Sequence, residues 1–144
     1  IQKKLIDINY HIYGSPKYLE KHGFPKSTSD LNKHSFISFG RGAPSPVYNP
    51  DWALKLGTKD NKKRKTVMKV NSVYGLLLAV QSGVGLAALP DYITVNQPNI
   101  VKVLPNIEGP ITEAHFVYPQ SMKNVARVQA FRNFLYSKIS EWEF

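Results

Sequence analysis

The most apolar stretch of the chain, VNSVYGLLLAVQSGVGLAALP at residues 70–90, is also the most strongly punctuated. It joins a run of leucine, valine and alanine to a paired-glycine sequence, Gly-Val-Gly, at residues 83–85. A membrane-spanning helix needs about eighteen consecutive apolar residues. Gln81 and Ser82, followed by the glycines, cut the run in two. The stretch is therefore predicted to belong to the core of a globular domain.

The paired glycines also look like part of a dinucleotide-binding loop, but the order of elements excludes that function. In such a loop the glycines follow a strand and open a helix. Here a helix from about Ser72 to Ser82 comes first, and a strand, VGLAALP, follows. Gly83 is predicted to close the helix in a left-handed conformation, so that the chain turns directly into a buried strand.

The start of the same helix is a better candidate for binding. Asn71 or Ser72 is a good N-cap, and the exposed amides of a helix start, with a hydroxyl beside them, form a ready anion site. Ordinary capping without a ligand is the alternative, and the residues alone favour that simpler interpretation.

The composition fits one globular domain. A chain of 144 residues with 42% apolar and 12% aromatic residues can bury a real core and is not disordered. The net charge of +9 points to anionic partners, although the scattered lysines favour a solvated basic surface. The chain has no cysteine and shows no secretory signal, so we expect a cytoplasmic protein. Ile1 is not a start residue, so we expect a piece of a longer protein.

Strands and short helices are predicted to alternate along the chain, which is the α/β class. Strands are predicted at LIDINYHIY (5–13), SFISF (35–39), WALKLG (52–57), KTVMKVN (65–71), IVKVLP (100–105) and TEAHFVYP (112–119). Short helices are predicted at GSPKYLEKHG (14–23), where Ser15 can cap, and at STSDLNKH (27–34) with Ser27 or Ser29 as the cap. A short helical turn is predicted at DYITVN (91–96). The segment GRGAPSPVYNPD (40–51) is predicted to be a loop.

The segment TKDNKKR (58–64) is predicted to be the polar turn of a hairpin between WALKLG and KTVMKVN. The basic run at residues 62–65 lies at its tip. A nucleic-acid patch is one interpretation of this run, and a solvated tip is the simpler one, because no aromatic residue interleaves with the charges.

The last predicted element is an amphipathic helix from Asn124 to Trp142. Its apolar residues recur at spacings of three and four and form a stripe that needs a partner surface. The stripe consists of Val128, Phe131, Leu135, Ile139 and Trp142.

Catalytic and metal-binding motifs are not found in the sequence. The four histidines are far apart and none has a ligand-type neighbour, so we expect structural or surface roles and no metal ion. A nucleophile elbow and a phosphate loop of the Gly-x-x-x-x-Gly-Lys type are both absent. We therefore expect a protein that is not an enzyme and has no cofactor.

Four segments in sequence resemble the C-terminal effector (substrate)-binding domain of LysR-type transcriptional regulators. They are YGSPKYLEKHGFPKSTSDLNKHSFISF, VNSVYGLLLAVQSGVGLAALPDYI, IVKVLPNIEGPITEAHFVYP and VARVQAFRNFLYSKI. The resemblance runs from about Tyr13 to Ile139. Each segment alone is weak evidence for this family, but the occurrence of all four in the right order is specific to it.

The resemblance implies a type 2 periplasmic-binding-protein-like fold, in which two α/β lobes are joined by two crossover strands. We expect the whole chain, 1–144, to be a partial effector-binding domain that is truncated at its N-terminal side. Residues 13–118 would form the complete second lobe with both crossover strands, and residues 122–142 the C-terminal helix. The first lobe would be largely missing, and no DNA-binding domain would be present. The apolar face of the last helix would then lose its family partner, so it would pack in an unusual place or be covered by another chain.

The resemblance also implies a ligand cleft between the lobes. It places the helix start at Asn71, Ser72 and Val73 against the effector. The turn at Gly14 and Ser15 is expected to lie toward the same region. So is the loop at Gly40 and Arg41, where Arg41 could pair with a carboxylate or be an ordinary surface arginine.

The function implied is that of the effector-sensing and oligomerisation region of a LysR-type regulator. Its expected partners are an anionic small-molecule effector, further copies of the chain, and DNA through a helix-turn-helix domain outside this chain, with no membrane. Ligand binding would shift the population toward a closed cleft. A solute-binding receptor of the same fold, serving a transporter, is the alternative, and a small enzyme acting on a phosphate-containing substrate is a poorer one.

Overall fold

In the computed structural model, which describes residues 1–40, 49 and 51–142, strand β2 (Tyr10–Gly14) is buried along its whole length. It is the middle strand of a three-stranded sheet with β5 (Ala87–Pro90) on one side and β6 (Val101–Val103) on the other. Both neighbours run antiparallel to β2. This sheet is the centre of unit 2, Asn9–Pro110, which is one of two compact units in the chain.

The two faces of this sheet are covered by different helices, because successive residues of a strand point to opposite sides. Ile12 belongs to a cluster with α1 (Pro16–His22) and α2 (Trp52–Lys55), and Tyr13 to a cluster with α3 (Val73–Gln81). The buried helical residues are Tyr18, Leu19, Ala53 and Leu54 on the first face and Leu76, Leu77 and Val80 on the second. The sheet is therefore the middle layer between helices.

A second, two-stranded sheet in the same unit determines where α3 begins. β3 (Phe36–Phe39) and β4 (Thr66–Val70) pair in parallel. A parallel bridge from Phe36 to Leu86 links β3 to the segment that enters β5. Because β3 and β4 run in the same direction, their carboxyl ends meet at one edge, and α3 starts directly after β4.

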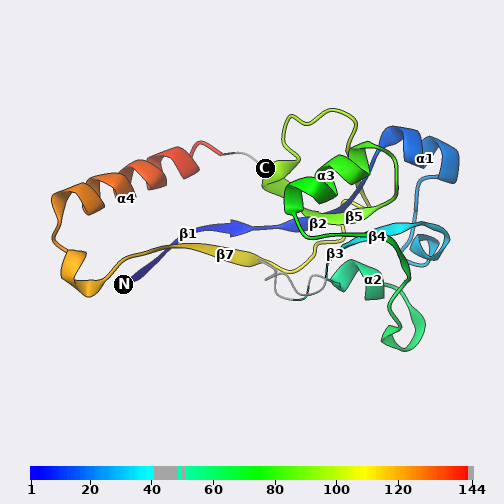
Figure 1. Ribbon diagram of the computed structural model, residues 1–144, viewed down its shortest axis with the longest axis horizontal. Helices are drawn as coiled ribbons and strands as arrows, with labels where there is room; N and C mark the ends of the chain where they lie inside the picture. The colour runs from blue at the N-terminus through cyan, green and yellow to red at the C-terminus, as the bar shows by residue number, and fades with distance from the viewer. Residues whose placement is uncertain (41–48, 50, 143–144) are drawn as a thin grey trace. The chain divides into compact units, whose positions relative to one another are not determined.

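Unit 1 consists of Ile1–Ile8 and Ile111–Phe144 and is built on a two-stranded antiparallel ribbon (Figure 1). β1 (Gln2–Ile8) pairs with β7 (Thr112–Val117), with an irregularity between Lys4 and Ile6. α4 (Ala126–Ile139) contacts this ribbon through the Tyr136 hydroxyl, which donates to the Lys4 carbonyl at 2.9 Å, and through an edge-on contact of Phe131 with Phe116.

Short 3₁₀ turns complete the described elements. They are η1 (Asp30–Lys33), η2 (Lys59–Asn61), η3 (Asp91–Ile93) and η4 (Gln120–Met122). The turn predicted at residues 91–96 is confirmed by η3.

The central prediction, a helix closed by glycine and followed by a buried strand, is confirmed. Ser72 caps α3, Ser82 follows its last residue, and Gly83 has the left-handed φ of 80°. The helix at 14–23 and the strands at 35–39, 100–105 and 112–119 are also confirmed by α1, β3, β6 and β7.

The strand predicted for WALKLG and the hairpin predicted around residues 58–64 are both wrong. Residues 52–55 form α2, whose neighbours Ala53 and Leu54 are both buried, a pattern that a strand with one solvent face cannot give. β4 exists at Thr66–Val70, but its partner is β3 in parallel rather than the preceding segment.

Two further elements differ from their predicted form. In place of the helix predicted at 27–34, only Asp30–Lys33 form the 3₁₀ turn η1. The Asp30 carboxylate accepts bonds from the amides of Lys26 and Ser27, and the Ser29 side chain makes no capping bond. The strand predicted at 5–13 is divided at Asn9, because β1 and β2 belong to different sheets. Of the loop predicted at 40–51, residues 41–48 and 50 lie outside the described residues.

The last helix is shorter than predicted, and its apolar stripe is only partly covered. α4 spans Ala126–Ile139, and none of its residues is fully buried. Phe131 and Trp142 are more than half exposed, whereas Val128, Leu135 and Ile139 are half-buried. Whether another chain covers this face stays a prediction.

Candidate functional site

At the start of α3, backbone amides without a partner among the described residues lie beside a hydroxyl. Ser72 is extended, at φ −138° and ψ 132°, and its Oγ accepts a hydrogen bond of 3.2 Å from the amide of Gly75. The Ser72 carbonyl accepts from the amide of Leu76. Val73 and Tyr74 occupy the first two helical positions, whose amides have no partner within a helix. Ser72 is exposed and Val73 half-buried, so the positive end of the helix dipole faces solvent.

Gly40 lies directly beside this helix start. Its amide donates to the Val70 carbonyl at 2.9 Å, which continues the β3–β4 ladder beyond the ends of the strands. A methyl group added at Gly40 would lie 3.6 Å from the Asn71 Cβ, an ordinary contact distance. Four of the predicted site residues, Gly40, Asn71, Ser72 and Val73, are thus brought together at the carboxyl edge of β3 and β4.

Gly14 ends β2 and Ser15 precedes α1, so neither belongs to the helix start at Ser72. Ser15 is 1% exposed and accepts the Tyr18 amide at 3.2 Å as the N-cap of α1. A methyl group added at Gly83, just beyond the end of α3, would lie 3.5 Å from the Ser15 Oγ. An α-helix of nine residues is about 13 Å long, so this pair lies near the end of α3 opposite to Ser72. Arg41 lies outside the described residues.

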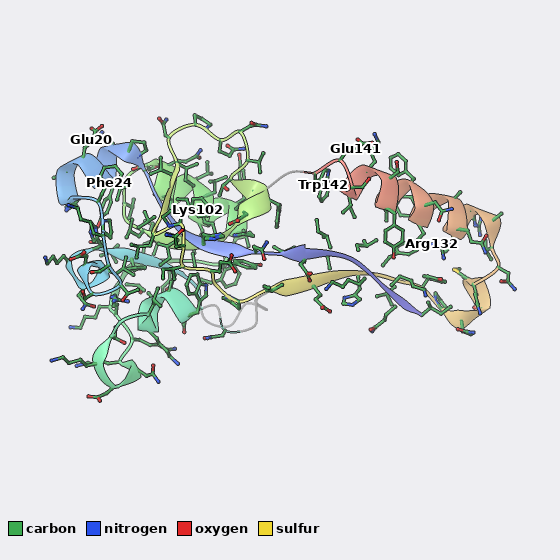
Figure 2. All side chains as sticks on the ribbon, turned by 180° about the vertical axis from the view of Figure 1, so that it is seen from behind. Glu20, Phe24, Lys102, Arg132, Glu141 and Trp142 are labelled. Carbon is green, nitrogen blue, oxygen red and sulfur yellow. The ribbon has the colours of Figure 1, made fainter. Side chains whose placement is uncertain are left out.

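A buried polar cluster of unit 2 was missed by the sequence analysis. Asp91, which follows β5 and is 4% exposed, accepts from the Tyr13 hydroxyl at 2.8 Å and from the Lys102 ammonium at 3.1 Å. Its Oδ1 also lies 2.8 Å from the His11 Nδ1, and its amide donates to the Asn9 carbonyl. Lys102, labelled in Figure 2, is the middle residue of β6 in the three-stranded sheet.

This cluster ties three elements together with its polar groups satisfied. Thr94 adds a bond from its hydroxyl to that of Tyr13 at 3.1 Å. Burial is the largest influence on Tyr13 and raises the pKa of its phenol well above the usual value. The sequence held a signal for the cluster: a single acid directly after a buried strand, and a lysine in the middle of another, at Asp91 and Lys102.

The remaining histidines have structural surroundings. His22 stacks on the ring of Tyr18 at 4.4 Å, and His115 lies 3.5 Å from a carboxylate oxygen of Glu113. Burial lowers the pKa of His34 below its usual value. Residues 1–40, 49 and 51–142 contain no group of three acidic, histidine or cysteine side chains able to hold a metal ion.

A surface cavity of about 480 Å³ lies between two loops of unit 2. Residues 25–28 line one side and residues 104–107 the other. None of the six predicted site residues that the structure describes lines this cavity. No helix in the described part of the chain is long and apolar enough to span a membrane.

Comparison with known proteins identifies the family of this fold and helix start. Residues 1–139 match the model of the LysR substrate binding domain. The chain belongs to this family. The expected resemblance to the regulatory domain of LysR-type transcriptional regulators is thereby confirmed over nearly the whole chain.

The curated relatives are transcriptional regulators that are longer than this chain. An uncharacterised HTH-type transcriptional regulator of Haemophilus influenzae is 29% identical over 123 residues, which are 83% of this chain and 41% of that protein. The HTH-type regulator CrgA of Neisseria meningitidis serogroup B is 25% identical over 141 residues, 95% of this chain and 46% of that protein. The chain therefore spans less than half the length of these relatives.

Solved regulatory domains share the fold. The CrgA regulatory domain of Neisseria meningitidis matches with a TM-score of 0.78 at 24% identity, covering 96% of this chain and 68% of that one. The effector domain of AmpR from Pseudomonas aeruginosa matches with a TM-score of 0.67 at 19% identity, covering 96% and 65%. The α/β architecture is that of the type 2 periplasmic-binding-protein-like fold, as the sequence predicted.

Proposed function

We propose that this chain is the effector-sensing region of a LysR-type transcriptional regulator and that it binds an anionic small molecule at the start of α3. The observation that carries this proposal is that Gly40 lies next to Asn71 at the capped start of α3, where two parallel strands end. In open α/β sheets, ligands bind in the crevice at the carboxyl ends of the strands. The helix dipole and free amides favour a negative charge there.

Each residue has its own role in the proposed site. Ser72 supplies a hydroxyl in addition to holding the helix start, and the Val73 amide supplies a donor. Gly40 leaves room for the ligand, because a side chain at this position would fill the space beside Asn71. Arg41 would follow directly and pair with a carboxylate. In the family's fold, a first lobe supplies the facing wall of the cleft.

The mechanism is a population shift in which a chain that binds effector better in its closed state moves toward that state. We propose that the regulator is not an enzyme, that it is cytoplasmic and works as a homo-oligomer, and that it reaches DNA through a helix-turn-helix domain outside these 144 residues. The relatives support this reading over a transporter receptor, because they are named as transcriptional regulators.

A thermal-stabilisation screen tests the proposal. Small carboxylates, phosphates and neutral matched compounds are added to the chain and to the full-length regulator that is proposed to carry it. A true effector present at about 100 times its Kd stabilises by about 2.7 kcal/mol, a shift of roughly 8 °C in a domain of this size. Stabilisation by neutral compounds but by no anion would contradict the anionic site.

Two alanine variants, one at each end of α3, test where the ligand binds. Gly40→Ala introduces no clash, since the nearest atom would be 3.6 Å away, so it should fold normally and bind less well. Ser82→Ala changes an exposed hydroxyl at the other end of α3, which donates to the Leu78 carbonyl, and should leave ligand-induced stabilisation unchanged.

A further inference from the structure

The loop between α2 and β4 carries the densest positive charge of the chain. Seven of the nineteen Lys and Arg residues fall between Lys55 and Lys69, and Asp60 is the single acid in that interval. In Figure 1 this loop extends away from the sheet of its own unit. This concentration of positive charge differs from the even scatter of lysines over the surface that the sequence analysis expected.

Two members of the basic run are already engaged. Lys63 pairs with Asp51. Arg64 is half-buried, donates to the Asn32 side chain and to the carbonyls of Ala53 and Thr28, and lies over a phenyl ring in the core. Burial lowers the pKa of this guanidinium. Arg64 therefore anchors the base of the loop rather than serving as a free contact.

Three lysines remain available on the loop. Lys59, Lys62 and Lys65 are exposed, and no ion pair joins them to another described residue. Asp60 and Asn61 both adopt left-handed backbone conformations, with φ of 55° and 53°. The Lys62 amide donates to the Lys59 carbonyl and closes the turn. An anchored turn thus presents three uncompensated ammonium groups.

The surroundings of these lysines select the kind of polyanion. Residues 57–66 contain no large apolar side chain that could insert into a lipid surface, and the exposed Val67 and Met68 that follow belong to β4 and not to the loop. They contain no aromatic ring for stacking on unpaired bases. Their one arginine is engaged in the fold, so its planar guanidinium is not free for a bidentate contact with a base edge. What remains is point-charge contact with regularly spaced phosphates.

We propose that the Lys59–Lys62–Lys65 loop contacts the phosphate backbone of double-stranded DNA without reading its sequence. This inference goes beyond the proposed effector site and stands on the charge and geometry of the loop. The contact would hold the sensing region against DNA that a separate domain selects, because backbone contacts position a protein without carrying sequence information.

Fluorescence anisotropy with a random-sequence DNA duplex tests the inference on the 144-residue chain. The variant Lys59→Gln, Lys62→Gln, Lys65→Gln removes three positive charges from exposed positions. Its affinity at about 50 mM salt should fall at least tenfold, and the slope of log affinity against log salt should decrease by about three. Circular dichroism should show an unchanged fold.

A control variant with the same change in charge separates the loop from the net charge. Lys17→Gln, Lys21→Gln, Lys26→Gln alters exposed positions on and after α1. Its affinity should stay within about twofold of the unchanged chain. An equal loss in both variants would overturn the inference, and so would undetectable binding of the unchanged chain at about 50 mM salt. Tighter binding to phosphatidylserine vesicles than to the duplex would also overturn it. None of these results would affect binding of a ligand at α3.

Discussion

Asp91 is the residue on which the buried polar contacts of unit 2 converge. Its carboxylate is bonded to Tyr13 and Lys102 and lies against His11, and its amide is bonded to Asn9, the first residue of the unit. Buried charges are tolerated when they are paired and hydrogen-bonded. The cluster therefore fixes β2, β6 and the turn after β5 in one arrangement.

Replacing Asp91 by Asn tests this role. The amide keeps the volume but replaces one of the two carboxylate oxygens, which accept from Tyr13 and Lys102, by a donor, so the free energy of unfolding should fall by about 2 kcal/mol in urea titrations. Asp60→Asn, at an exposed turn, is the control and should change stability by less than about 0.5 kcal/mol. Equal losses of unfolding free energy in the two variants would mean that the cluster does not stabilise the fold.

Tyr13 gives the cluster a pH signature. Its pKa is raised in the folded state, so below pH 10 the phenol is neutral in both states and its contribution is fully present. Above pH 10 the unfolded chain loses this proton and the folded chain keeps it. The free energy of unfolding then falls by up to about 1.4 kcal/mol for each unit of rising pH. Tyr13→Phe should remove this part of the alkaline decline, measured as the difference between the two urea series. Parallel curves for the two proteins would contradict it.

The two glycines that connect α3 to β5 have different structural roles. Gly83 supplies a left-handed turn, whereas Gly85 permits close packing: a methyl group there would lie 2.6 Å from the Ser35 carbonyl oxygen. That oxygen also accepts from the Leu86 amide, which joins β3 to the entry of β5.

Gly85→Ala should therefore destabilise the fold by about 2 kcal/mol, because the obstructing atom belongs to the backbone and cannot rotate away. Gly40→Ala, whose nearest neighbour would be 3.6 Å away, should cost less than about 0.5 kcal/mol. Chemical denaturation of both variants measures the difference. A tolerated Gly85→Ala would show that β3 and the β5 entry are not packed as closely as described.

The elements that sequence predicted well are those fixed by local chemistry. The Ser72 cap, the Ser15 cap and the Gly83 turn each rest on bonds within a few residues. The missed elements depend on distant partners. WALKLG and KTVMKVN look like a hairpin until β3 is known to pair with β4, which no local pattern reveals.

The candidate site was partly predictable for the same reason. Asn71, Ser72 and Val73 are adjacent in sequence, and the resemblance placed Gly40 near them. Asp91 was missed because its partners at His11 and Lys102 lie 80 and 11 residues away in sequence. A polar residue in an alternating pattern, such as His11, looks solvent-facing unless its buried partner is known.

At the scale of the whole molecule, the two units differ in how much of them is buried. Unit 2 holds both hydrophobic clusters, whereas α4 of unit 1 has no fully buried residue. An isolated helix of about 14 residues is marginal in water. The α4 helix therefore depends on contacts such as those of Phe131 and Tyr136.

Hydrogen exchange should show this difference directly. Amides of α4 are expected to exchange at least about 100-fold faster than those of α3, which buries Leu76, Leu77 and Val80. Mass spectrometry of peptides from the two helices gives the ratio. Protection of α4 equal to that of α3 would show that another surface covers its apolar stripe in solution.

The central claim, an anionic effector held at the start of α3, is tested most directly by the affinity of a screened ligand for Ser72→Asp. Aspartate is as good an N-cap as serine and suits the helix dipole, so the unfolding temperature without ligand should be equal or higher. Its negative charge would occupy the place proposed for the anion. Calorimetric titration should show at least about a 100-fold loss of affinity. An affinity equal to that of the unchanged chain would contradict the account.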